Sequence, residues 1–169
     1  MFDHRGAIYH NVLSMAADPS LELITPGGGR LALTRAALRG LPAAQQVADV
    51  GLLVPGKQGR AVWLAALLER CGGQAGARFL NLQSADPAFS VSLPLEELPR
   101  GALVVYELDG EPLPEKKGGP FRLLVPGHAD ECVHVKSLAR VELAPVRGRD
   151  TRPADDEAHR ALHAKKKQV

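Results

Sequence analysis

The chain has 169 residues, the length of one domain that can bury a full hydrophobic core. Hydrophobic residues make up 45% of it and charged residues 24%, a balance that excludes a disordered chain. No uninterrupted apolar run reaches the roughly 18 residues of a transmembrane helix, so no membrane partner is expected. The first twenty residues lack the apolar stretch of a secretory signal, which favours a cytoplasmic protein.

The net charge of +2 is spread unevenly along the chain. Residues 147–169 hold seven Lys or Arg and four Asp or Glu, whereas residues 1–146 hold 14 and 15. A nucleic-acid-binding surface needs basic residues gathered on the folded domain, so this distribution argues against a nucleic-acid partner. Two cysteines, Cys71 and Cys132, are too few for a disulfide framework and are expected to be reduced thiols.

Three regions are expected from the pattern of apolar residues. Residues 1–20 show little periodicity and are predicted to form a leader arm. Residues 21–146 carry the periodic apolar segments and are predicted to form the folded domain. Residues 147–169 are rich in charge and poor in large apolar side chains, which predicts a solvated or disordered tail.

The first predicted elements are two short strands, residues 21–24 and 30–33, joined by a glycine-rich turn. The turn lacks the Gly-Lys-Ser/Thr and the long helix of a phosphate-binding loop, so it is predicted to close a hairpin. Thr34 is expected to cap a helix of about one turn that ends at Gly40.

A strand over residues 45–54 and a helix over residues 59–71 are predicted next. The helix is indicated by apolar residues at helical spacing, and Gly72-Gly73 is expected to end it. Cys71 shares this spacing and is therefore predicted to be a buried small hydrophobe.

The second half of the chain is predicted to be rich in strands. In residues 89–93, Phe, Val and Leu alternate with serine, which predicts a strand buried on one face. Asp109-Gly110 predicts a tight hairpin turn. The remaining predicted elements are strands over 79–84, 102–108, 121–125 and 138–143, and a helical turn over 95–98.

Three ordered motifs resemble a known family. Residues 109–114 read Asp-Gly-Glu-Pro-Leu-Pro, residues 118–127 read Gly-Gly-Pro-Phe-Arg-Leu-Leu-Val-Pro-Gly, and residues 135–142 read Val-Lys-Ser-Leu-Ala-Arg-Val-Glu. Together they resemble the C-terminal half of the sulfite-oxidase-like molybdopterin-binding domain. The resemblance implies an α+β fold of mixed and antiparallel sheets with short helices, and an oxidoreductase-like protein with a redox protein as partner.

The resemblance also implies a site for molybdopterin, a small anionic pterin cofactor. Arg122 matches the arginine of the family's Gly-Gly-Pro-x-Arg strand, and Lys136 matches the lysine of its Val-Lys-x-Leu motif. A planar arginine and a compact lysine charge suit the phosphate and the dithiolene of such a cofactor. His128, His134 and Ser137 complete the expected cofactor-binding set. The alternative is that Arg122 points outward from its strand and Lys136 is merely solvated.

The loop between these two motifs departs from the family. Asp130 and Glu131 stand where many members are basic, and two carboxylates beside an anionic ligand would repel it. A second, minor hypothesis is a metal site made of His128, Cys132 and His134. The closely spaced Cys-Cys or His-His pairs that are usual in structural zinc sites are absent.

The metal-binding cysteine of the family is also missing. In the family it precedes a helix that residues 59–68 match, and the preceding residues 50–56 contain no cysteine. Leu52 and its neighbours cannot ligate molybdenum. The sequence therefore predicts no catalytic residue and a molybdopterin-binding-fold protein without oxygen-atom transfer. The alternatives are a scaffold or interaction protein whose cleft no longer binds cofactor, and an enzyme whose metal lacks a cysteine ligand.

Overall fold

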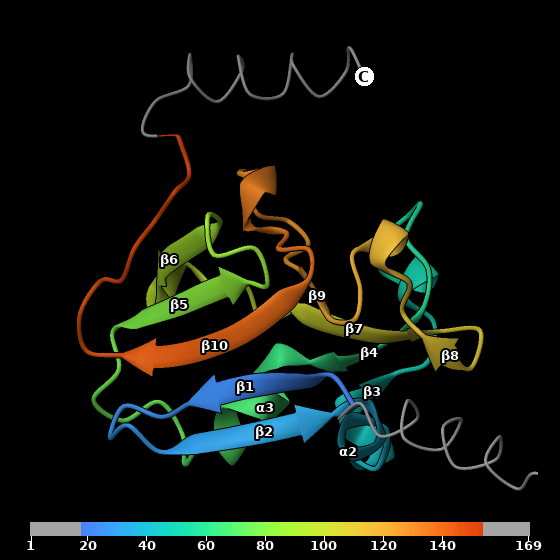
Figure 1. The fold of residues 1–169 in the computed structure, drawn as a ribbon, viewed down its shortest axis with the longest axis horizontal. Helices are drawn as coiled ribbons and strands as arrows, with labels where there is room; N and C mark the ends of the chain where they lie inside the picture. The colour runs from blue at the N-terminus through green and yellow to red at the C-terminus, as the bar shows by residue number, and fades with distance from the viewer. Residues whose placement is uncertain (1–17, 154–169) are drawn as a thin grey trace, which may run out of the picture.

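The structure is a computed structural model, and it describes residues 18–153. Most of the predicted leader arm and residues 154–169 of the predicted tail lie outside the described residues. Two five-stranded sheets make up the described part, with short helices beside them (Figure 1). The predicted strand-rich α+β architecture is therefore confirmed.

The first sheet is mixed because one of its strand pairs is parallel. The first and last strands pair in parallel, with Leu23 beside Val141, and every other pair is antiparallel. In spatial order its strands are β2 (Arg30–Thr34), β1 (Ser20–Ile24), β10 (Leu138–Ala144), β5 (Phe79–Ser84) and β6 (Ser90–Pro94).

The second sheet is entirely antiparallel. Asp109 and Gly110 both have left-handed φ angles, 52° and 79°, where β7 turns into β8, so the predicted tight turn is confirmed. The order is β3 (Gln46–Val47), β4 (Arg60–Trp63), β7 (Leu103–Leu108) and β8 (Glu111–Pro112), with β9 (Arg122–Leu124) also on β7.

The described helices are short. Thr34 caps the first of them through its side-chain oxygen, which accepts a hydrogen bond from the Ala37 N–H, as predicted. No described helix is long and apolar enough to cross a membrane. The described α-helices are α2 (Arg35–Arg39) and α3 (Leu64–Arg70). The described 3-10 turns are η3 (Ala43–Gln45), η4 (Val50–Leu52), η5 (Leu95–Glu97), η6 (Glu115–Lys117) and η7 (Glu131–Val133).

The main hydrophobic core joins both sheets and α3. Fully buried residues from the two sheets, such as Leu23 and Tyr106, belong to one cluster with Leu67 of α3. The Tyr106 hydroxyl donates to the Gln46 side-chain oxygen over 2.7 Å, so the large ring is buried without losing its hydrogen bond.

Two predictions for the segment before α3 are wrong. The expected strand over residues 45–54 is reduced to Gln46–Val47, because the Asp49 side chain accepts the Gly51 N–H and turns the chain into η4. The expected helix begins at Leu64 and not at residue 59. Arg60–Trp63 pairs with β7 instead. Ala61 and Val62 point to opposite faces of this strand and are both buried, and two adjacent apolar residues fit a helical pattern as well as a strand buried on both faces.

The predicted half-buried strand at residues 89–93 is wrong in its burial. Ser90 and Ser92 of β6 are buried, as are the apolar residues Val91 and Leu93. The reason is that residues 147–153, predicted to belong to a solvated tail, lie along this strand, where Thr151 N–H donates to the Ser90 carbonyl over 2.9 Å. Of these seven residues, Gly148 and residues 150–153 are half-buried, whereas Arg147 and Arg149 are exposed.

Candidate functional site

A pocket of about 630 Å³ is lined by loops of both sheets. We call it the basic pocket. Its walls come from the segment after η4, the β5–β6 connection, β9, and η7 with the residues that follow it. Its lining residues are Val54, Lys57, Ser84, Asp86, Phe89, Arg122, Glu131, Cys132, His134 and Lys136.

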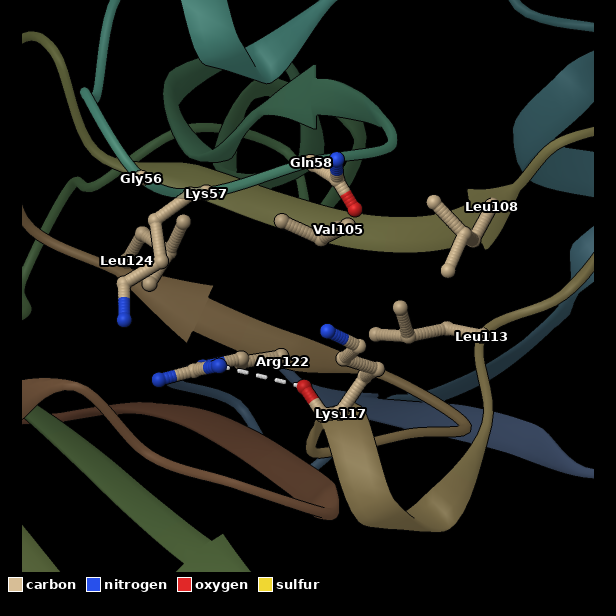
Figure 2. A pocket seen from close by; sticks show the side chains of 9 residues that line it. All are labelled: Gly56, Lys57, Gln58, Val105, Leu108, Leu113, Lys117, Arg122 and Leu124. Carbon is tan, nitrogen blue, oxygen red and sulfur yellow. Dashed lines mark hydrogen bonds between the residues drawn. The ribbon is translucent and has the colours of Figure 1, made fainter.

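A smaller pocket of about 120 Å³ adjoins the basic pocket and shares Lys57 and Arg122 with it. Figure 2 shows the Lys57 side chain reaching from the loop at Gly56 toward the Arg122 side of this pocket, with Lys117 on the opposite wall. Its floor is apolar and is formed by Val105, Leu108, Leu113 and Leu124.

Arg122 is the central cation of both pockets. Its terminal amine donates to the Lys117 carbonyl over 3.1 Å, whereas its buried Nε has no hydrogen-bond partner within the described residues. Burial lowers the pKa of its guanidinium. A buried donor without a partner is costly, so this group favours a ligand that accepts a hydrogen bond from Nε.

Gly118 allows two of the basic side chains to lie close to the backbone. A Cβ at this position would stand 2.8 Å from Cδ of Arg122 and 3.2 Å from Cγ of Lys136. Its φ angle of 93° is also one that glycine adopts readily. The glycine therefore brings the stems of the arginine and the lysine to one place.

The four basic residues Lys57, Lys117, Arg122 and Lys136 form what we call the cationic cluster. The charge of Arg122 is the main cause that lowers the pKa of Lys57, followed by burial and by Lys136, while Glu131 opposes the shift. None of the four makes a salt bridge among residues 18–153. The repulsion among these cations, which Glu131 offsets only in part, makes the cluster suited to an anion.

His134 enters the basic pocket as a neutral ring. Its Nδ1 accepts the Val125 N–H over 2.9 Å. Burial, and then the charge of Arg122, lowers its pKa. A neutral ring that accepts at Nδ1 carries its proton on Nε2, so His134 offers the pocket an uncharged donor.

The five predicted cofactor-binding residues separate into two groups. Arg122, His134 and Lys136 line the basic pocket together, whereas His128 and Ser137 line neither pocket. The His128 ring accepts the Asp130 N–H over 3.1 Å. Ser137 has a left-handed φ of 49° and donates its hydroxyl to the Gly119 carbonyl over 2.9 Å, so it braces the turn before β9.

Sequence reasoning missed Lys57 and Lys117. Neither belongs to a quoted motif, and the cluster forms only when the loop after η4 folds over β9. One signal was available for Lys57, which follows the segment that the resemblance assigned to the missing metal ligand. The repulsion expected from Asp130 is not realised, because Arg152 lies 3.0 Å from its carboxylate; Glu131 does line the basic pocket.

The structure gives no support to the hypothesis of a metal site at His128, Cys132 and His134. Among the described residues, no group of three His, Cys, Asp or Glu side chains is arranged to hold a metal ion. One ring nitrogen of each histidine already accepts a backbone N–H. Cys71 and Cys132 are both buried and form no disulfide with each other, and burial raises the pKa of the Cys71 thiol.

Comparison with known proteins identifies the family. Residues 56–150 match the oxidoreductase molybdopterin binding domain. This range covers more than half of the chain, and the chain therefore belongs to that family. The resemblance seen in the three sequence motifs is confirmed.

Two curated relatives are the mitochondrial sulfite oxidases of Macaca fascicularis and Homo sapiens. Each is 40% identical over 81 residues, which cover 44% of this chain and 14% of the relative. The chain thus spans a small part of these proteins. The sulfane dehydrogenase SoxCD from Paracoccus pantotrophus shares the fold, with a TM-score of 0.56 and 22% identity over 76% of this chain and 39% of that one.

Proposed function

We propose that the protein binds a phosphorylated pterin of the molybdopterin type in the basic pocket and does not transfer oxygen atoms. The observation that carries the proposal is the cationic cluster, with the buried, unpartnered Nε of Arg122 at its centre. An anion placed there would relieve both the repulsion among the cations and the cost of the unmade hydrogen bond.

The residues present fit the organic part of the cofactor. Arg122 and Lys136 would hold its anionic groups, as the family resemblance implies, and Lys57 would add a third positive charge from the opposite wall. Phe89 supplies an apolar surface in the basic pocket, and His134 supplies a neutral donor. When it carries its metal, this cofactor supplies the oxygen-atom transfer chemistry of the family.

The residues present do not supply the family's thiolate at its expected place. The segment of residues 48–59 before β4 contains no cysteine, and the Leu52 side chain within it is 83% exposed. Cys71 is buried in the core beside α3. Cys132 does line the basic pocket, but it comes from η7 and not from the segment that carries the ligand in the family. These placements support a non-catalytic protein.

A second candidate function is a scaffold or an interaction partner in a redox complex. Leu52 and Leu53 are exposed apolar side chains on η4 and its end, next to the loop that carries Lys57. Glu131 in the wall of the basic pocket also disfavours an anion. The scaffold function is favoured if the purified protein retains no pterin.

We also propose a cytoplasmic location, which is supported by two buried cysteines without a disulfide.

The test is purification of the full chain from a host that synthesises molybdopterin. Pterin fluorescence after oxidation and metal analysis should show pterin in the wild type and a marked loss in Arg122→Ala. Arg149→Ala, which removes an exposed arginine outside the basic pocket, is the matched control. A wild-type preparation without pterin would overturn the binding proposal.

The absence of catalysis is tested on the same preparation. Oxidation of sulfite and reduction of sulfoxides should stay at background. Turnover of about 1 per second or more, an ordinary enzyme rate, would overturn the non-catalytic assignment. If that turnover persisted in Cys132→Ser, a ligand other than this thiol would hold the metal.

A further inference from the structure

Residues 147–153, which we call the strap, run along the outer edge of β6. Figure 1 shows this red segment leaving the end of β10 and passing the β5–β6 side of the first sheet. Ser90 N–H donates to the Thr151 hydroxyl and Ser92 N–H to the Asp150 carboxylate, over 3.0 and 3.3 Å. The strap therefore satisfies main-chain groups on the free side of an edge strand.

Arg152 is the best-connected residue of the strap. Its guanidinium lies 2.6 Å from the Asp150 carboxylate and donates to the Ser92 carbonyl over 3.2 Å. Its side chain is only 17% exposed. The hydrogen bond and charge of Asp150 raise the pKa of Arg152 against the opposing effect of burial, so the cation is held firmly in this place.

Arg152 also reaches beyond β6 to the wall of the basic pocket. One of its terminal amines lies 3.0 Å from Oδ2 of Asp130. The other oxygen of the same carboxylate, Oδ1, accepts the Cys132 N–H over 2.8 Å and so caps η7. A single carboxylate thus joins the strap to η7.

The residues that follow this carboxylate form one wall of the basic pocket, namely Glu131, Cys132 and His134. We infer that Arg152 is a positioning residue that holds this wall in place through Asp130. Without Arg152, Asp130 would keep its cap of η7 but lose its ion pair with the strap, and the short η7 turn would be tied to the rest of the fold by fewer contacts. The wall would then open more often.

Cys132 reports the opening of this wall, and Cys71 is its internal control. Each cysteine residue is 8% exposed, but Cys71 follows α3 in the main core and lies outside η7 and the strap. The experiment treats the full chain, without ligand, with a thiol reagent and follows both cysteines by peptide mass spectrometry. In Arg152→Ala, labelling of Cys132 should accelerate about tenfold or more while that of Cys71 stays unchanged, because the opening is local.

Two further variants complete the test. Asp130→Asn keeps an oxygen that can cap η7 and leaves the contacts of the strap with β6, so it isolates the ion pair and should also accelerate labelling of Cys132. Its effect should not add to that of Arg152→Ala in the double variant. Arg149→Ala, which removes a strap side chain that donates to the Pro87 carbonyl and not to Asp130 among the described residues, should label like the wild type.

Wild-type labelling of Cys132 in both Arg152→Ala and Asp130→Asn would overturn the inference. Equal acceleration of both cysteines in both variants would also overturn it, since that result means global unfolding. If Arg152→Ala does not fold, Asp130→Asn decides alone. The inference deepens the proposed function, because the wall that Arg152 holds belongs to the proposed pterin pocket. Any effect of Arg152 on pterin affinity rests on the proposed function. The labelling experiment requires no ligand, so it can fail or succeed independently of the pterin proposal.

Discussion

Lys57 and Arg122 face each other at the junction of two pockets, and the charge of Arg122 is the main cause that holds the pKa of Lys57 below its ordinary value. One cation comes from the loop after η4 and the other from β9. Neither makes a salt bridge within the described part of the chain. Folding has therefore gathered like charges at one place, which is typical of a site that takes its counter-ion from solution.

The Arg122→Ala variant should raise the pKa of Lys57, because it removes the largest repulsion on the ammonium group. NMR titration of isotopically methylated lysines measures this shift directly. Lys116→Ala removes a lysine that is not among the causes of the shift and should leave the Lys57 titration in place. An unchanged Lys57 titration in Arg122→Ala would show that the two charges do not interact.

His134 should make stability depend on mildly acidic pH. Its pKa in the folded protein lies below the ordinary 6.5, so the unfolded chain binds the proton more readily. The free energy of unfolding should therefore decline as pH falls below 6.5 toward the lower folded value. Urea unfolding between about pH 7.5 and pH 5 measures the slope, which His134→Asn should reduce.

Gly119→Ala should strongly destabilise the fold. A Cβ there would stand 1.7 Å from the Leu113 carbonyl oxygen and 2.9 Å from that of Pro114, both of them backbone atoms that cannot rotate away. Ordinary overpacking costs about 1–3 kcal/mol, and this clash should cost at least the upper end of that range. Gly101→Ala, with no atom within 4 Å of its Cβ, is the control in urea unfolding. Equal stabilities of the two variants would contradict the close approach.

Truncation after Val146 should lower the free energy of unfolding by about 2 kcal/mol or more, because it removes charge-assisted hydrogen bonds and uncovers β6. A chain that ends at Pro153 keeps Asp150, Thr151 and Arg152 and should be more stable in urea unfolding than the chain that ends at Val146. The sequence alone predicts a solvated or disordered tail over residues 147–169, which could be removed at little cost. Full stability of the chain that ends at Val146 would restore that prediction.

Elements with local signals could be predicted from the sequence. The hairpin of β1 and β2, the Thr34 cap and the turn at Asp109-Gly110 each depend on neighbouring residues, and the structure has all three. Arg60–Trp63 could not be assigned, because apolar residues at 61 and 62 and a following helix fit one long helical pattern. Only pairing with Val104 and Val105 of β7 decides for a strand.

The candidate site was predictable where a motif carried it. Arg122 and Lys136 follow from ordered glycine, proline and basic residues, and the structure places both in the basic pocket with His134. Lys57 is far from them in the sequence and is brought close only by the tertiary fold. The sequence places Arg152 in a solvated tail, because a charged residue in a sequence does not show whether its side chain is hydrated or paired. In the fold it is paired with Asp130 and Asp150.

The position of β10 has a consequence for how the chain acquires its structure. This strand lies between β1 and β5, so it joins a hairpin from the first part of the chain to one from the middle. During synthesis the β1–β2 and β5–β6 pairs can form early, but they remain separate units until residues 138–144 have left the ribosome. Their inner edges stay unpaired until then. The first sheet is thus completed late, and contacts of such large sequence separation slow folding.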